Sequence, residues 1–124
     1  RYQTVAAQHR RKRLEQIGCI QRYVALLDRE KLGYDMVCFI TVSLQFHQIE
    51  ATDHFRQVVA EMPEVLECFQ VTGDYDYILK VAIRNRKDLQ HFLMDRLTPI
   101  TGIAQIHTRI VLNEIKSTTV LPLE

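Results

Sequence analysis

Long apolar runs are absent from this chain. Its 124 residues are 47% hydrophobic and 25% charged, but no stretch approaches the roughly 18 consecutive apolar residues that a membrane span needs. The first residues also contain no apolar stretch of the kind found in signal peptides. We therefore expect a cytoplasmic, globular chain of about one domain, without membrane contact and large enough for a core of its own.

Cysteine is scarce, and patterns typical of metal or catalytic sites are missing. Cys19, Cys38 and Cys68 are odd in number, widely spaced and set among apolar residues, which favours reduced core thiols over disulfides or metal ligands. The five histidines show no zinc-ligand spacing, and no serine or cysteine lies in a nucleophile elbow. The sequence therefore predicts no cofactor, no metal site and no catalytic residue, and we expect a protein that is not an enzyme.

A strong net charge is also missing, but the charges are unevenly distributed. The net charge is +1, yet the first 13 residues hold five basic and no acidic side chains, so the remainder carries −4. The basic residues are Arg1, Arg10, Arg11, Lys12 and Arg13. A basic N-terminal segment on a mildly acidic body favours contact with phosphate. A solvated helix face is the alternative, and charge alone does not decide between the two.

Glycine and proline are few, and most of them mark boundaries. Residues 3–17 contain neither and consist largely of helix formers, and Gly18 stops the predicted helix. Residues 19–27 predict a small hairpin or an extended wing. The charged segment 28–33 ends in Gly33, and we interpret it as a linker.

From Met36 onward, some segments have alternating apolar and polar residues, as strands do, and the segments between them have apolar residues at helical spacing. The first helix ends at Pro63, and the second stops before Pro99. The order predicts a ferredoxin-like βαββαβ fold of the α+β class, with both helices on one face of a four-stranded antiparallel sheet. The expected segments are 36–46, 55–62, 65–72, 75–84, 89–97 and 103–113.

The face of the predicted sheet opposite the helices is also partly apolar. Its aliphatic residues have no further segment of this chain to cover them. We therefore expect a second copy of the chain to cover this face, which predicts a homodimer at least.

The segment from Val71 to Tyr77 is the most informative for function. Gly73 and Asp74 form a favoured hairpin pair because both residue types tolerate positive φ, so we expect a tight turn. Two carboxylates, Asp74 and Asp76, flank an aromatic residue beside backbone amides that a small ligand can reach. A simple chain reversal is the structural alternative.

Short motifs lie along nearly the whole chain, and their order and spacing are specific although each is weak alone. They are Arg13-Leu14-Glu15, Gly18-Cys19-Ile20, Tyr23, Leu27-Asp28, Leu32-Gly33, Met62-Pro63-Glu64-Val65, Val71 to Tyr77, Gly102-Ile103, Thr108, Val111-Leu112, Ile115-Lys116, Thr118-Thr119 and Leu121-Pro122-Leu123. Together they resemble the Lrp/AsnC family, the feast/famine transcription regulators. The resemblance implies that residues 1–33 are the remnant of a helix-turn-helix with its wing and linker. Residues 34–124 would be the amino-acid-sensing and oligomerisation domain, of the dimeric α/β barrel type.

The resemblance implies that the N-terminal helix contacts DNA in the complete protein. The expected DNA-binding residues are Thr4, Gln8, Arg10, Arg11 and Arg13. Family members carry further helices before the position of Ala7, and these hold the recognition helix at the groove. Arg11 stands where a core aliphatic residue is usual. We therefore expect this chain, with an incomplete helix-turn-helix, to read DNA sequence poorly.

The resemblance also implies binding of a small amino acid rather than catalysis. Asp74 and Asp76 would accept from its ammonium group, while amides near Gly73 and the Thr108 hydroxyl would donate to its carboxylate. The expected effector-binding residues are Gly73, Asp74, Tyr75, Asp76, Ile106 and Thr108. By the family's pattern this pocket lies between dimers of a ring, so we expect an octamer.

Two other functions stay open at this stage. Relatives of this fold decarboxylate haem precursors and use histidines in the sheet cavity, and a coloured, tetrapyrrole-binding protein would favour such an enzyme. Alternatively, the chain associates with full-length regulators and modulates their assembly without an effector of its own. Stabilisation by an amino acid, without colour, would favour the sensor.

Overall fold

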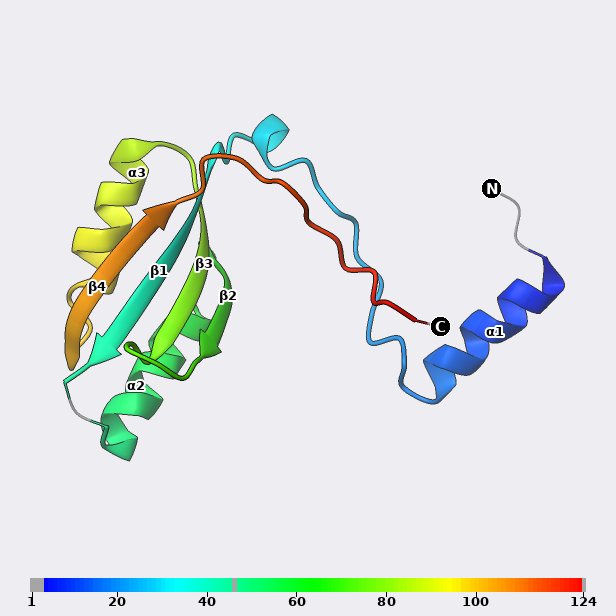
Figure 1. Cartoon of the computed structure of the whole chain (residues 1–124), viewed down its shortest axis with the longest axis horizontal. Helices are drawn as coiled ribbons and strands as arrows, with labels where there is room; N and C mark the ends of the chain where they lie inside the picture. Colours follow the sequence, from blue (N-terminus) through cyan, green and yellow to red (C-terminus); the bar gives the residue numbers. More distant parts are fainter. Residues whose placement is uncertain (1–3, 46, 124) are drawn as a thin grey trace.

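The structure is a computed structural model that describes residues 4–45 and 47–123. A four-stranded sheet is covered on one face by helices, and the N-terminal helix lies apart from it (Figure 1). None of the described helices is long and apolar enough to cross a membrane. The elements are α1 (Val5–Gln16), the 3₁₀ turn η1 (Glu30–Leu32), β1 (Met36–Leu44), α2 (Ile49–Ala60), β2 (Val65–Gln70), β3 (Tyr77–Ile83), α3 (Arg86–His91), the π-helix η2 (Phe92–Leu97) and β4 (Ile103–Ile110).

The four strands form one antiparallel sheet in the order β2-β3-β1-β4. At its centre, Ile40 of β1 lies opposite Leu79 of β3 and Thr108 of β4. Helix α2 connects β1 to β2, whereas α3 and η2 together connect β3 to β4. This is the predicted βαββαβ order, so the ferredoxin-like, α+β prediction is confirmed.

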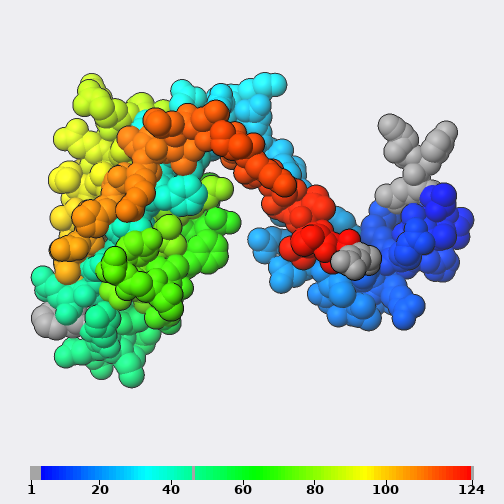
Figure 2. Space-filling view, in the orientation of Figure 1, coloured from blue at the N-terminus to red at the C-terminus, as the bar shows by residue number. Residues whose placement is uncertain are grey.

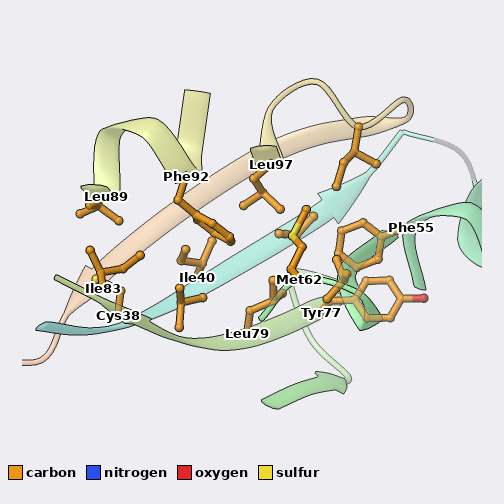
Figure 3. Packing of buried hydrophobic residues seen from close by; sticks show 14 of the residues in the cluster. Cys38, Ile40, Phe55, Met62, Tyr77, Leu79, Ile83, Leu89, Phe92 and Leu97 are labelled. Carbon is orange, nitrogen blue, oxygen red and sulfur yellow. The ribbon is translucent and has the colours of Figure 1, made fainter. Parts of the chain in front are cut away.

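Alternation along the strands decides which side chains form the core. Cys38 and Ile40 of β1 are completely buried on the face that the helices cover, and Phe55 and Phe92 pack onto this face (Figure 3). The ring centroids of Phe55 and Tyr77 lie 4.7 Å apart. Full burial of one such large apolar side chain contributes roughly 1.5–3 kcal/mol to stability. The core cluster also contains Val42, Leu44, Val59, Met62, Leu79, Val81, Ile83, Leu89, Leu97 and Ile100.

The other face of the sheet, called the open face below, carries a mixture of aromatic, aliphatic and basic side chains. Phe39 of β1 lies opposite Lys80 and Arg109, and Phe69 of the edge strand β2 lies opposite Ile78. Phe69 is 53% exposed. The helices α2 and α3 lie behind the sheet and leave this face uncovered (Figure 1). Its coverage by a second copy stays a prediction.

Helix α1 begins and ends through local capping rather than through packing. The Thr4 hydroxyl accepts a hydrogen bond from the Ala7 amide at 3.1 Å, as an N-cap does. At the other end Gly18 has φ of 84°, and the Cys19 amide donates to the Leu14 carbonyl at 2.8 Å. This closure confirms that Gly18 ends the helix. The helix has no buried residue.

Two extended arms connect to the sheet domain: the linker arm, residues 20–28, and the C-terminal arm, residues 111–123. Both leave the sheet domain on the side where α1 lies (Figures 1 and 2). The linker arm is extended and not a hairpin, because none of its residues belongs to a strand. Its large apolar side chains remain exposed, with Leu26 at 82%. On the C-terminal arm, Leu112 is 96% exposed. The last strand ends at Ile110 rather than Asn113.

The segment predicted as a plain linker contains the 3₁₀ turn η1. The Asp28 carboxylate accepts a hydrogen bond from the Lys31 amide at 3.2 Å, which starts the turn. Gly33 ends it with φ of 90°, a conformation that favours glycine. Local capping residues therefore give this linker a defined turn.

The three cysteines occupy different environments, and all are free thiols. Cys38 lies in the core, where burial raises the pKa of its thiol. Cys19 and Cys68 are exposed. The prediction of core cysteines is therefore wrong for these two, because Cys19 follows the isolated α1 and Cys68 lies on the edge strand β2.

Candidate functional site

The loop between β2 and β3 is longer than the tight turn that the sequence predicts. The Val71 amide donates to the Asp76 carbonyl at 3.0 Å, so residues 72–75 form the tip, and β3 begins at Tyr77. Only Gly73 takes a positive φ, of 113°, whereas Asp74 does not. A Cβ atom at Gly73 would meet nothing within 4 Å, so the backbone there is open to a ligand.

Asp76 ties this loop to the end of β1. Its Oδ2 atom accepts a hydrogen bond from the Leu44 amide at 2.8 Å, and its Oδ1 atom lies 3.2 Å from Nε2 of His47. The Asp76 amide donates to the Val42 carbonyl at 2.9 Å. Both carboxylate oxygens therefore have partners within the chain. The observed role of Asp76 is therefore structural. Its contact with a ligand remains a prediction.

A hollow of about 210 Å³ opens on the open face next to the loop tip. We call it the open-face hollow. Strands β1 and β4 supply its floor, and the loop supplies one wall. Its lining residues are Thr41, Ser43, Asp74, Tyr75, Gln105, His107 and Arg109.

The structure brings only some of the predicted effector residues together. Asp74 and Tyr75 line the open-face hollow. Ile106 and Thr108 pair with Val42 and Ile40, so they lie on the core face of the sheet instead. Gly73 and Asp76 belong to the same loop but do not line the hollow.

Sequence reasoning missed the residues that β4 contributes to this hollow. Gln105, His107 and Arg109 alternate along β4 with Ile106, Thr108 and Ile110, and therefore point to the open face. The alternation that placed Ile106 and Thr108 on one side was the available signal. The same alternation places Gln105, His107 and Arg109 on the other side.

The open-face hollow has a basic side chain, Arg109, on its floor and an acidic side chain, Asp74, on the wall that the loop supplies. Nη1 of Arg109 lies 3.5 Å from Oγ1 of Thr41, a residue that is only 1% exposed. Within the described ranges, neither Arg109, His107 nor Asp74 forms an ion pair. The hollow can therefore present a guanidinium to a carboxylate and a carboxylate to an ammonium group.

Helix α1 presents the predicted DNA-binding residues on an exposed surface. Arg10 and Arg13 line a shallow depression on this helix with His9, Lys12 and Gln16. The Tyr23 hydroxyl donates a hydrogen bond to Glu15; this contact raises the pKa of Tyr23 and joins the linker arm to α1. Of the predicted residues, Thr4 has its hydroxyl oxygen occupied by the N-cap contact.

Comparison with known proteins identifies the family. The Lrp/AsnC ligand binding domain model matches residues 37–121. The chain belongs to the Lrp/AsnC family. The chain is 36% identical over 115 residues to the DNA-binding transcriptional activator DecR of Escherichia coli K12, a match that covers 93% of this chain and 76% of DecR. It is 37% identical over 112 residues to the Bkd operon transcriptional regulator of Pseudomonas aeruginosa, covering 90% and 73% of the two chains.

Solved structures of Lrp/AsnC regulators have the same fold. A transcriptional regulator of Neisseria meningitidis in complex with L-Met superposes with a TM-score of 0.90 at 36% identity, covering 95% of this chain and 76% of that one. AsnC of E. coli gives a TM-score of 0.79 at 30% identity, with 93% and 76% covered. This Lrp/AsnC chain is therefore a transcriptional regulator rather than an enzyme, as predicted.

Proposed function

We propose that this Lrp/AsnC chain binds a small amino acid in the open-face hollow. The carrying observation is that Asp74 and Arg109, which have opposite charges and no ion-pair partner among the described residues, line the same hollow. Asp74 would accept from the ammonium group, and Arg109 would donate to the carboxylate. A regulator that is 36% identical was solved with L-Met, which supports this class of effector.

The size of the hollow fits a small ligand whose binding site is completed by another chain. Its volume of about 210 Å³ lies below the roughly 300–1,000 Å³ of typical drug-sized pockets. Backbone amides near Gly73 offer further donors to the carboxylate. Tyr75 supplies an aromatic wall for the side chain of the effector. The amino acid would contact the open face, so its binding would depend on how this face is covered.

We further propose that residues 34–124 are the sensing and oligomerisation domain. The open face would pair with that of a second copy, and such dimers would join into an octameric ring. The half-exposed Phe69 on the open face and the exposed apolar residues of both arms support association, because large apolar side chains on a monomer remain in water. The arms would be ordered by contacts with neighbouring copies.

Residues 1–33 are proposed to be the end of a DNA-binding helix-turn-helix with its wing and linker. Helix α1 would lie against DNA through Gln8, Arg10, Arg11 and Arg13, with Thr4 at its N-terminus. Its lack of buried residues supports a surface role. The complete protein would act on DNA in the cytoplasm. Helix α1 would contact duplexes through their phosphates, with little preference for sequence.

The effector proposal is tested by a thermal-shift screen against the twenty amino acids. A ligand that binds only the native state raises the melting temperature, because it adds RT ln(1 + [L]/Kd) to stability. We expect one or a few amino acids to stabilise the wild type and not the Asp74→Asn variant. Glu61→Gln, an exposed change at the end of α2, is the matched control. No shift with any amino acid would contradict the proposal.

A further inference from the structure

A second cavity, called the linker cavity below, lies at the opposite end of β3 from the open-face hollow. Its volume is about 490 Å³, within the roughly 300–1,000 Å³ that small-molecule sites usually occupy. One wall comes from Leu27, Leu32 and Tyr34 around η1. The opposite wall comes from the sheet, where Leu66 and Ala82 present apolar groups. The cavity therefore has an apolar body.

Two arginines on its rim are held in place without an acidic partner. The Arg84 guanidinium lies 4.7 Å over the centroid of the Tyr34 ring and donates a hydrogen bond to the Tyr34 hydroxyl at 3.1 Å. Arg29 donates to the Tyr34 carbonyl. In the residues that the structure describes, neither arginine forms an ion pair. Stacking on the ring fixes Arg84 before a ligand arrives, which lowers the cost of binding.

The acidic residues that line the same cavity are engaged elsewhere. Oε2 of Glu64 forms an ion pair with Arg96 at 2.7 Å, whereas the buried Oε1 of Glu64 has no hydrogen-bond partner among the described residues. Oδ2 of Asp88 accepts a hydrogen bond from the Arg84 backbone amide at 3.0 Å. Because Glu64 is paired with Arg96, the two arginines on the cavity wall face one remaining carboxylate, Asp88, and the wall keeps a net positive charge.

We propose that the linker cavity binds a small molecule that has an apolar body and one carboxylate. Its carboxylate accepts hydrogen bonds from Arg84 and Arg29, since the planar guanidinium fork matches a carboxylate. Its apolar body lies between Leu32 and Leu66. This site is separate from the open-face hollow and takes a different class of ligand.

The place of the cavity in the chain gives the ligand a regulatory effect. Leu27 belongs to the linker arm, and Leu32 and Tyr34 follow it, so a bound ligand contacts both the linker and the sheet domain. The linker joins α1 to the sheet domain. Occupancy therefore holds the linker against the sheet and restricts the positions that α1 can take.

Calorimetric titration with sodium octanoate, 1-octanol and octylamine tests this site. These probes share one apolar chain and differ in the charge of the head group. We expect octanoate to bind with a stoichiometry of one per chain, and the alcohol and the amine to bind at least tenfold more weakly. Arg84→Gln should weaken octanoate binding by about tenfold or more, because a charge-assisted hydrogen bond is lost. Arg86→Gln, an exposed change two residues away, is the matched control.

Leu66→Gln provides a second variant that leaves both arginines in place. Leu66 is 53% exposed, so the fold should tolerate the change while the apolar wall becomes polar. It should weaken octanoate binding, and Asp74→Asn should leave octanoate binding unchanged even where it abolishes amino-acid binding. Absence of saturable octanoate binding to the wild type overturns the proposal, including the case in which an arm or a second copy fills the cavity. Equal affinity for the three probes, or for wild type and both cavity variants, also overturns it.

Discussion

At the scale of single residues, Asp74 and Asp76 differ although both come from one short motif. Asp74 is exposed and lines the open-face hollow, whereas Asp76 has its two oxygens on Leu44 and His47. Asp74, which has no ion pair among the described residues, therefore lies only two positions from a carboxylate that holds the end of β1. The motif therefore contains a candidate ligand group and a structural support for it.

Asp76→Ala should destabilise the sheet domain. The side chain of Asp76 is 29% exposed, and losing its bond leaves the Leu44 amide without its acceptor, at a cost of about 1–3 kcal/mol. Urea denaturation should show a lower midpoint for Asp76→Ala. Asp76→Asn, which retains an acceptor oxygen, should lower the midpoint by a smaller amount. An unchanged midpoint for Asp76→Ala would show that the loop needs no such support.

At the scale of elements, alternation and helical spacing predicted the order of the strands and helices of the sheet domain but not all of their bounds. Helix α2 begins at Ile49, six residues before the predicted start, and the second predicted helix is divided into α3 and the π-helix η2. In β1 and β3 the completely buried apolar residues, such as Cys38 and Ile40, occupy every second position because the helices cover that face, and this alternation indicates the strands in the sequence. The loop length was missed because a glycine next to an aspartate favours a two-residue turn, while the Val71–Asp76 pair closes a longer loop. Such a pairing depends on contacts with β1 that local sequence does not contain.

The effector residues on β4 show the same limit. Thr108 was chosen for its hydroxyl, but the register with β1 places it on the core face. Arg109, one position further, faces the hollow. Residue type alone does not indicate which face a strand position takes, whereas the pairing of two strands does.

Helix α1 gives a prediction at the element scale. Arg10→Ala and Arg13→Ala should each weaken DNA binding to a similar extent on any duplex, because they remove phosphate contacts. Each change should lower the slope of log affinity against log salt by about 1. The measurement is a fluorescence anisotropy titration at several salt concentrations with a candidate operator and a scrambled duplex.

Arg86→Ala, which removes a basic side chain from α3, is the matched control and should leave DNA binding unchanged in the same titrations. A preference of a hundredfold or more for the operator would show that the chain reads base sequence in addition to contacting phosphates. An equal loss for Arg86→Ala would show that overall charge rather than α1 determines binding.

At the scale of the whole molecule, the uncovered surface is the dominant feature. The open face and the two arms leave large apolar side chains in water, with Leu26 and Leu112 at 82% and 96% exposure. The core of the sheet domain does not bury these side chains. We therefore expect association to complete a structure that one chain leaves partly unpacked.

Phe69→Asp should weaken self-association, because it places a charge on the open face. Light scattering should give at least a dimer for the wild type at micromolar concentration, and a smaller particle for the variant. Met94→Asp is the matched control, since Met94 is similarly exposed, at 58%, but lies on η2 away from the open face. The melting temperature of the wild type should rise with protein concentration. A monomeric wild type would contradict the proposed assembly.

The most direct test of the proposed effector site is a calorimetric titration of the best-stabilising amino acid into three proteins. These are the wild type, Arg109→Gln and Thr108→Val. Binding in the open-face hollow predicts that Arg109→Gln weakens affinity by about tenfold or more, because a charge-assisted hydrogen bond to the carboxylate is worth about 1.5–3 kcal/mol. It also predicts that Thr108→Val, a change on the core face, has little effect. Unchanged affinity for Arg109→Gln with a large loss for Thr108→Val would contradict this site.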